Sequence, residues 1–182
     1  MHSLARYSLF SLLLFPLISN AQAKDEGLIH WDPSRKLNWS DYKGRPDLQS
    51  DAAASTTTYL GMEYNIGQSG FKYSIQSLFS ISRSWGLYKT DYILTHEQGH
   101  FDIAEIFARQ LNKEISEYQF NRPTCQQDLD KIYKKVLSEK EKMQNDYDEE
   151  TNHSINKEKQ TEWLKKIGQK LTELNAYSNY GK

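Results

Sequence analysis

The pentapeptide His96-Glu97-Gln98-Gly99-His100 combines residue types and spacing that could do chemistry. On an α-helix, residues four apart lie about one turn from each other on the same face. Two imidazoles at that spacing can bind one zinc ion, so His96 and His100 are candidate metal ligands. Glu97 is offset by about 100° around the helix from His96, which places its carboxylate beside the metal.

A carboxylate beside a zinc ion is typical of enzymes that hydrolyse peptide bonds. Zinc lowers the pKa of a bound water to about 7 and stabilises the oxyanion that forms. We expect Glu97 to act as the general base and then to pass the proton to the leaving amine. The row of residues at helical spacing around the histidines is apolar, which predicts that both imidazoles face the interior.

A catalytic zinc site needs a third protein ligand and an open position for water. Asp102 and Glu105 are close to the histidines in sequence. Each nevertheless lies about 140–160° around the helix from the histidine pair. We therefore expect these two carboxylates in salt bridges or caps, and the third ligand on another element.

The third ligand is expected in the polar segment 146–154. A second helix is predicted at about residues 126–145, and if it packs antiparallel to the first, its end returns to the level of the histidines. The segment that follows would open beside the metal. We favour His153 as the third ligand, with Asp148 and Glu150 as the alternatives.

Two residues of the same segment are candidates for supporting roles. Tyr147 could donate its hydroxyl to the oxyanion as a second catalytic residue, although a packing role is the simpler interpretation. Asp148 could orient a ligand imidazole from behind it.

The elements that must position these residues divide the chain into two halves. In the second half, apolar residues at helical spacing predict a helix over residues 91–118 that starts at a Thr90-Asp91 cap. Asn121-Arg122-Pro123 ends it, the second helix follows, and a last helix is expected at about residues 155–176.

The first half is rich in strand and turn signals. Residues 52–66 and 71–82 indicate two strands around a Gly67–Gly70 turn, and a short strand around residues 37–39 is possible. The strand at 52–66 could border the cleft and bind an extended peptide through the backbone of residues 55–58, or it could be an ordinary interior strand. The predicted fold class is α+β and zincin-like: a small antiparallel or mixed sheet packed on the H-E-x-x-H helix and two further long helices.

The N-terminal residues 1–23 are typical of a cleavable signal peptide. A single Arg precedes an apolar run of about a dozen residues, which is shorter than the ~20 residues of a membrane span. Ala21-Gln22-Ala23 supplies the cleavage site. These features predict a periplasmic or secreted protein with one domain over residues 24–182.

The amino-acid composition argues against several further classes of protein. The aromatic content is 13%, which argues against long disorder, and the net charge of −1 argues against a nucleic-acid binder that relies on bulk charge. A single cysteine, Cys125, excludes an intramolecular disulfide framework and a Cys-rich zinc site. Cys125 follows a loop-like Asn-Arg-Pro-Thr, so we expect an inert thiol at the start of a helix.

With these motifs in hand, the chain resembles the bacterial domain-of-unknown-function 922 family, regarded as secreted zinc-dependent proteases of the H-E-x-x-H superfamily. The resemblance implies a zincin-like fold, metal-dependent peptide hydrolysis and His153 as the third ligand. In that pattern a glycine follows the last histidine, and here Ser154 stands in its place. The matching positions are Trp39, Asp41, Tyr42, Gly44 and Pro46, then residues 96–105, then Tyr147, Asp148, Thr151, His153, Gln160 and Trp163.

The hypothesis is an exported metallopeptidase with Zn²⁺ on His96, His100 and His153, and a peptide or protein as its substrate. One rival is an envelope protein that binds zinc without turnover, for structure or for partner contact. Another is a metallohydrolase that acts on a non-peptide bond. A structural zinc site is closed by a fourth protein ligand, whereas a catalytic site keeps a position for solvent.

Overall fold

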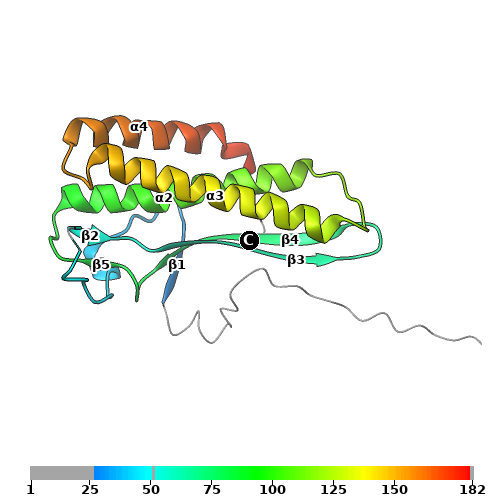
Figure 1. The fold of residues 1–182 in the computed structure, drawn as a ribbon, viewed down its shortest axis with the longest axis horizontal. Helices are drawn as coiled ribbons and strands as arrows, with labels where there is room; N and C mark the ends of the chain where they lie inside the picture. Colours follow the sequence, from blue (N-terminus) through cyan, green and yellow to red (C-terminus); the bar gives the residue numbers. More distant parts are fainter. Residues whose placement is uncertain (1–26, 51, 181–182) are drawn as a thin grey trace, which may run out of the picture.

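The computed structural model describes residues 27–50 and 52–180. The predicted signal peptide, residues 1–23, and its cleavage site lie outside this range. Within the described part of the chain, three long helices cover one side of a small sheet (Figure 1). None of the helices there is long and apolar enough to cross a bilayer.

The larger sheet has three antiparallel strands in the order β1-β4-β3. Strands β3 (Thr58–Ile66) and β4 (Phe71–Ser80) form a hairpin. Its turn closes with the Gly67 N–H donating to the Gly70 carbonyl over 2.8 Å, so the predicted hairpin is confirmed. The short strand β1 (Leu28–His30), which periodicity did not indicate, pairs with the far end of β4.

The prediction of one strand over residues 52–66 is wrong, because part of this segment belongs to a second, two-stranded sheet. That segment is broken into β2 (Ala54–Ser55) and β3, and β2 pairs with β5 (Trp85–Gly86) instead of continuing the hairpin. The break occurs because the Thr57 N–H donates to the Ser84 hydroxyl over 3.0 Å while its carbonyl accepts from Ser80. The chain thus passes from one sheet to the other at Thr57.

The expectation of a short strand around residues 37–39 is wrong. Trp39–Asp41 forms a single 3₁₀ turn, η1. Asn38 and Asp41 bond each other's backbone N–H groups in a capping box, which favours a helical turn over an extended strand.

The three helices are α2 (Asp91–Glu117), α3 (Cys125–Thr151) and α4 (Lys157–Glu173). Thr90 caps α2 as expected, accepting from the Ile93 N–H over 3.2 Å. Cys125 is fully buried at the start of α3, as the sequence predicts. A short 3₁₀ turn, η2 (Asn175–Tyr177), follows α4.

Helix α3 continues beyond the predicted end at residue 145, and this corrects the loop expected at 146–154. The helix ends only where Asn152 adopts a left-handed conformation and donates its N–H to the last carbonyls. Tyr147 and Thr151 are fully buried, and the Thr151 hydroxyl donates to the Tyr147 carbonyl over 2.7 Å. Burial of this last turn against α2 and α4 therefore outweighs its polar sequence. Asp148 and Glu150 are consequently helical residues.

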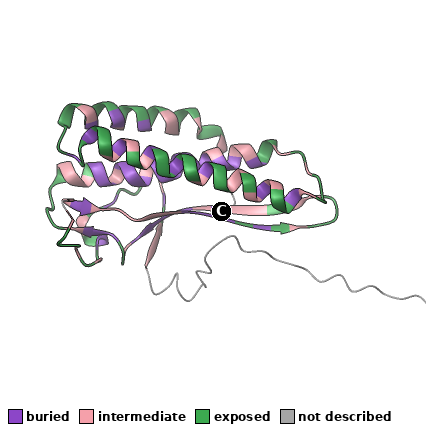
Figure 2. Ribbon diagram, in the orientation of Figure 1, coloured by how far each residue is buried: buried purple, intermediate pink, exposed green. Residues whose placement is uncertain are grey.

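Helix α2 lies in the middle of the domain. It contacts β3 and β4 on one side and α3 and α4 on the other, and Figure 2 shows it as the most continuously buried of the helices. The architecture is α+β, with small antiparallel sheets and three helices. The main core joins the inner face of the hairpin to the three helices and includes Leu60, Met62, Ile75, Ile103, Leu111, Ile115, Leu129, Val136, Tyr147, Trp163 and Ile167.

Candidate metal centre

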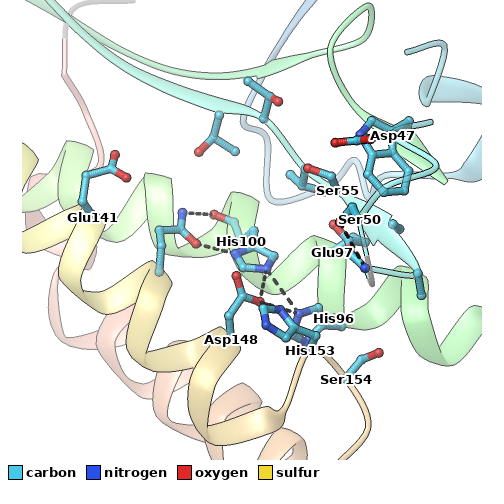
Figure 3. A pocket seen from close by; sticks show the side chains of 18 of the residues that line it. Asp47, Ser50, Ser55, His96, Glu97, His100, Glu141, Asp148, His153 and Ser154 are labelled. Atoms are coloured by element: carbon cyan, nitrogen blue, oxygen red, sulfur yellow. Dashed lines mark hydrogen bonds and ion pairs between the residues drawn. The ribbon is translucent and has the colours of Figure 1, made fainter. Parts of the chain in front are cut away.

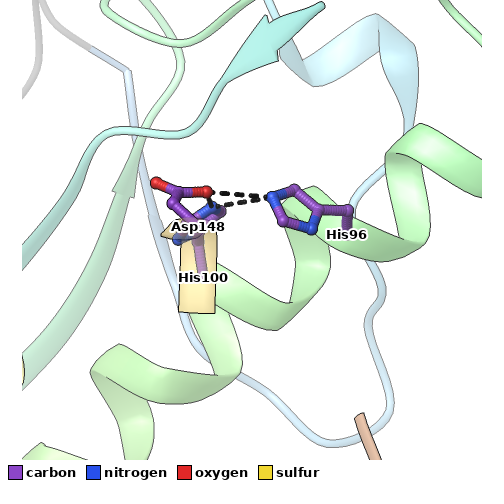
Figure 4. Close-up of side chains that lie close together, drawn as sticks. All are labelled: His96, His100 and Asp148. Atoms are coloured by element: carbon purple, nitrogen blue, oxygen red, sulfur yellow. Dashed lines mark hydrogen bonds and ion pairs between the residues drawn. The ribbon is translucent and has the colours of Figure 1, made fainter. Parts of the chain in front are cut away.

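Two histidines of α2 and one aspartate of α3 bring their polar atoms to one point (Figure 4). His96 and His100 are 3% and 8% exposed, and their Nε2 atoms are 3.2 Å apart. Asp148 Oδ1 lies 3.1 Å from each of these nitrogens. The three ligand atoms lie within 4.8 Å of one another, a grouping that suits a metal ion.

The ring of Tyr147 fixes how α3 meets α2 at this point. It stacks on the His96 ring with centroids 4.4 Å apart, and its hydroxyl donates to the His96 carbonyl over 3.2 Å. The close approach needs a glycine on α2, because a Cβ at Gly99 would lie 2.6 Å from the Tyr147 hydroxyl. The residue after Tyr147 is Asp148, so this packing also sets the position of the carboxylate.

Gln144 orients the second imidazole. Its amide nitrogen donates to the His100 carbonyl over 2.9 Å, and its amide oxygen lies 2.5 Å from His100 Nδ1. Because that oxygen can only accept, Nδ1 carries the proton. Nε2, which faces Asp148 and His96, is then the nitrogen that gains a lone pair when the ring loses its second proton, and this is the arrangement that a metal-binding imidazole needs.

The charges of the cluster attract one another. Burial opposes protonation of His100, but its hydrogen bond to Asp148 and the charge of that carboxylate raise the His100 pKa to about 9. Burial also opposes ionisation of Asp148, but hydrogen bonds from His100 and His96 hold its pKa well below the usual range. The carboxylate thus stabilises positive charge at the meeting point of the three side chains, where a divalent cation could replace the proton.

Glu97 is buried beside the cluster without a full set of partners. It is 4% exposed, and its Oε2 has no hydrogen-bond partner among the described residues. A buried carboxylate oxygen without a partner is costly. A cation on the neighbouring donors, together with a reactant that uses this oxygen, would remove that cost. The orphaned oxygen therefore fits a metal site better than it fits a purely structural cluster.

These side chains open onto a cavity of about 510 Å³ (Figure 3). Asp148 comes from α3 and Ser55 from β2, and Figure 3 shows the two on opposite sides of the cavity with His100 between them. The described residues that line it are Asp47, Ser50, residues 52–58, Trp85, His96, Glu97, His100, Lys140, Glu141, Gln144, Asp148, His153 and Ser154.

His153, predicted as third ligand, lies next to the cluster and not in it. Its side chain is 63% exposed, and its Nδ1 is 3.6 Å from Asp148 Oδ1. Asp148, one of the alternatives, is the residue that joins the two histidines. Glu150, the other alternative, accepts from Trp163 Nε1 over 3.0 Å on the side facing α4.

Tyr147 does not present its hydroxyl to the cavity. It is fully buried, its hydroxyl bonds the His96 carbonyl, and it is absent from the cavity lining. Burial, and after it the charge of Glu97, raise the pKa of the phenol above its ordinary value. The structure thus shows Tyr147 in the packing role and gives no support to its use as an oxyanion donor.

The two carboxylates that helix geometry excluded are indeed bonded elsewhere. Asp102 accepts from Trp31 Nε1 over 2.8 Å and from the Gln98 amide over 2.7 Å. Glu105 pairs with Arg109 Nε over 2.8 Å and accepts the Tyr180 hydroxyl. Both side chains support the fold on the side of α2 away from the cavity.

Lys140 and Gln144 are among the cavity residues that sequence reasoning missed. They precede Asp148 by eight and four residues on α3, so all three lie on one face of that helix. The spacing of four residues is present in the sequence, but it predicts a shared helix face only if the helix extends past residue 145. The turn after α3 was also unforeseen: Asn152, His153 and Ser154 have φ of 49°, 49° and 75°.

Comparison with known proteins yields a family. A family model described as "Bacterial protein of unknown function (DUF922)" matches residues 36–154, which is more than half of the chain. The matched range contains the cavity, both helices that carry the cluster and the left-handed turn. No curated protein and no solved structure matches the chain.

Proposed function

The chain belongs to the DUF922 family of bacterial proteins, and we propose that it is an exported, zinc-dependent peptidase with a zincin-like active site. One observation carries the proposal: Glu97, next in sequence to His96, is buried in the wall of the cavity that the three converging ligand residues also line, and its Oε2 has no partner among the described residues. A carboxylate kept buried and unpaired at such a position suits a general base.

The donor set suits zinc. Two imidazole nitrogens and a carboxylate oxygen are ligands that this metal accepts, and Gln144 supplies the outer hydrogen bond that a ligand imidazole needs. When bound, zinc would polarise the scissile carbonyl and lower the pKa of a water to about 7. The geometry supports Asp148 as the third ligand, and His153 stays the alternative because its ring is 3.6 Å from the same carboxylate.

The protein's own residues would handle the protons. Glu97 Oε2 takes the proton of the attacking water, because no other group among the described residues occupies that oxygen. The same carboxylate then donates the proton to the leaving amine. Glu97 is one of the residues that line the cavity, so a water or a substrate bound there would lie next to its side chain.

The chain segment opposite α3 suits an extended peptide. Ala53 and Thr57 direct their backbone groups toward β5 and β4. Because backbone direction alternates along a strand, Ala54, Thr56 and Thr58 direct theirs away from β5 and β4, and all three residues line the cavity. A peptide could pair with these groups by β-augmentation and lay its scissile bond across the histidine cluster.

The shape of the site favours catalysis over a structural zinc. A structural site is closed by four protein ligands, whereas the described residues bring three ligand atoms together. All three ligand residues line the cavity, so a water or a substrate bound there could supply the remaining ligand.

Two measurements test the proposal. The first compares zinc content in wild type, His96→Ala, Asp148→Asn and His153→Ala; we expect loss in the first two variants and retention in the third. The second digests a broad peptide library with wild type and Glu97→Gln. Glu97→Gln should keep its zinc and lose hydrolysis by roughly 10²–10⁴-fold. Full hydrolysis by a zinc-loaded Glu97→Gln protein would refute the mechanism, and loss of zinc from His96→Ala and His153→Ala with retention in Asp148→Asn would move the third ligand to His153.

A further inference from the structure

Lys140 is a buried cation in the wall of the cavity. The residue is 4% exposed, although lysine is almost never buried to this extent without a partner. It lies on α3 eight residues before Asp148, on the same face as Gln144. At 1.5 Å per residue, its backbone is about 12 Å along the helix from that of Asp148, which carries the cluster's carboxylate.

The one hydrogen bond that Lys140 makes within the described part of the chain leaves most of the N–H donors of its ammonium group free. Its Nζ donates to Glu141 Oε1 over 2.8 Å, the one partner found among the described residues. An ammonium group has three donors. The side chain of Glu141 is 58% exposed against 5% for Lys140. Lys140 is therefore held in the wall while Glu141 can turn into water at little cost, as exposed ion pairs do.

Lys140 is also the single basic side chain, histidines aside, among the described residues that line the cavity; Asp47, Glu97, Glu141 and Asp148 are all acidic. Its ammonium group thus marks one end of the cavity as the place where an anionic group of a ligand would find a charged hydrogen-bond donor. Figure 3 shows the neighbouring Glu141 at the end of the cavity away from Asp47 and Ser50, which places this region on the far side of His100 from them.

We propose that Lys140 binds a carboxylate of the peptide substrate, so that the protein prefers acidic peptides. This inference rests on the proposed peptidase function. An extended peptide advances about 3.3 Å per residue, so a distance of about 12 Å corresponds to three or four residues from the scissile bond. The carboxylate is either an Asp or Glu side chain at that position or the C-terminal carboxylate of a peptide that ends there.

A binding experiment without turnover tests the inference. The Glu97→Gln protein, loaded with zinc, is titrated against fluorescent octapeptides of Ala, Ser and Thr in which one Glu is moved along the chain. Each peptide ends in an amide and is matched by the same peptide with Gln. A second set carries no acidic side chain and ends in a free carboxylate. The set that binds more tightly identifies the source of the carboxylate.

Three variants in that background separate Lys140 from its surroundings. We expect the acidic peptide to bind about tenfold more tightly than its neutral match, and Lys140→Gln to remove this preference. Glu141→Gln should enlarge it several-fold, because the competing carboxylate is gone. Lys142→Gln is the matched control: Lys142 is 73% exposed on the same helix and pairs with Asp146, so the preference should not change.

The outcomes distinguish this inference from the function on which it rests. Equal binding of acidic and neutral peptides, a preference that survives Lys140→Gln, or binding of no peptide at all would overturn it. If wild type then cleaves neutral peptides of the set, the peptidase proposal stands alone. If the preference follows Lys140 but wild type cleaves nothing, the carboxylate site stands and the peptidase proposal fails. If Lys140→Gln does not fold, the exposed Glu141→Gln variant decides the question. A preference for acidic peptides that is not larger in Glu141→Gln would contradict the inference.

Discussion

Replacing Gly99 by alanine is the sharpest test of the structure around the cluster. A Cβ at this position would lie 2.6 Å from the Tyr147 hydroxyl and 2.9 Å from Cε1 and Cζ of the same ring. Tyr147 is fully buried between His96 and Trp163, with centroids 4.4 and 5.6 Å away. The ring therefore has little room to withdraw, and the added methyl must push α2 and α3 apart.

The magnitude follows from opposing contributions. Alanine in a helix interior is more stable than glycine by up to about 1 kcal/mol. Overpacking of a filled core costs about 1–3 kcal/mol, and loss of the hydrogen bond from Tyr147 to the His96 carbonyl costs a further ~1 kcal/mol. Gly168 in α4 is the matched control, because a Cβ there meets no atom within 4 Å. Gly168→Ala should stabilise, and the two variants should differ by roughly 2–4 kcal/mol.

The assay is urea unfolding of both variants, with and without zinc, together with zinc affinity by competition against a chromophoric chelator. We expect Gly99→Ala to bind zinc at least tenfold more weakly, because Tyr147 positions both the His96 ring and the adjacent Asp148. Gly168→Ala should bind zinc like wild type.

Two results would refute the reasoning. One is a Gly99→Ala protein as stable as Gly168→Ala with unchanged zinc affinity. The other comes from combining Gly99→Ala with Tyr147→Phe, which removes the atom of closest contact. The double variant should recover part of the loss, so strictly additive effects would mean that Tyr147 does not lie over Gly99.

Three further predictions concern the surroundings of the cluster. Gln144→Leu removes the acceptor of His100 Nδ1 and should weaken zinc affinity by roughly 10–100-fold, measured by chelator competition; unchanged affinity would contradict the orienting role. Ser154→Gly relieves a φ of 75° and should raise the free energy of unfolding by about 0.5–1 kcal/mol, as seen in urea; a loss of stability would argue against the left-handed turn. Because Asp148 raises the His100 pKa to about 9, the ring of the metal-free protein is protonated at neutral pH. Zinc uptake should then release a proton at pH 7, and zinc affinity should rise with pH until about 9, as calorimetry in buffers of different ionisation enthalpy will show; uptake without proton release would contradict it.

Local signals predicted much of the fold. The cap at Thr90 and the apolar spacing after it located α2 to within a residue of its observed ends, and the Gly67–Gly70 turn located the hairpin. Helix geometry alone turned Asp102 and Glu105 away from the histidine face. Each of these features depends on contacts between residues close in sequence, which is why the sequence was enough.

Features that depend on distant contacts were not predictable in this way. The strand at 52–66 breaks because Ser84 and Ser80, more than twenty residues away, take up the backbone groups of Thr57. Helix α3 runs to Thr151 because Tyr147 packs against α2, although the sequence there is polar. Those extra turns bring Asp148 to the histidines and leave His153 in the left-handed turn beyond them. The choice between the two as third ligand therefore depends on where one helix ends.

The single thiol of the chain can report on local opening of the structure around it. Cys125 is the single cysteine of the chain and is completely enclosed where α3 begins, some 35 Å along the helix axis from Asp148. A thiol-reactive dye can reach it only when this end of the molecule opens. Comparing labelling rates with and without zinc would therefore reveal whether a cation bound near the C-terminal end of α3 makes local opening at its N-terminal end less frequent.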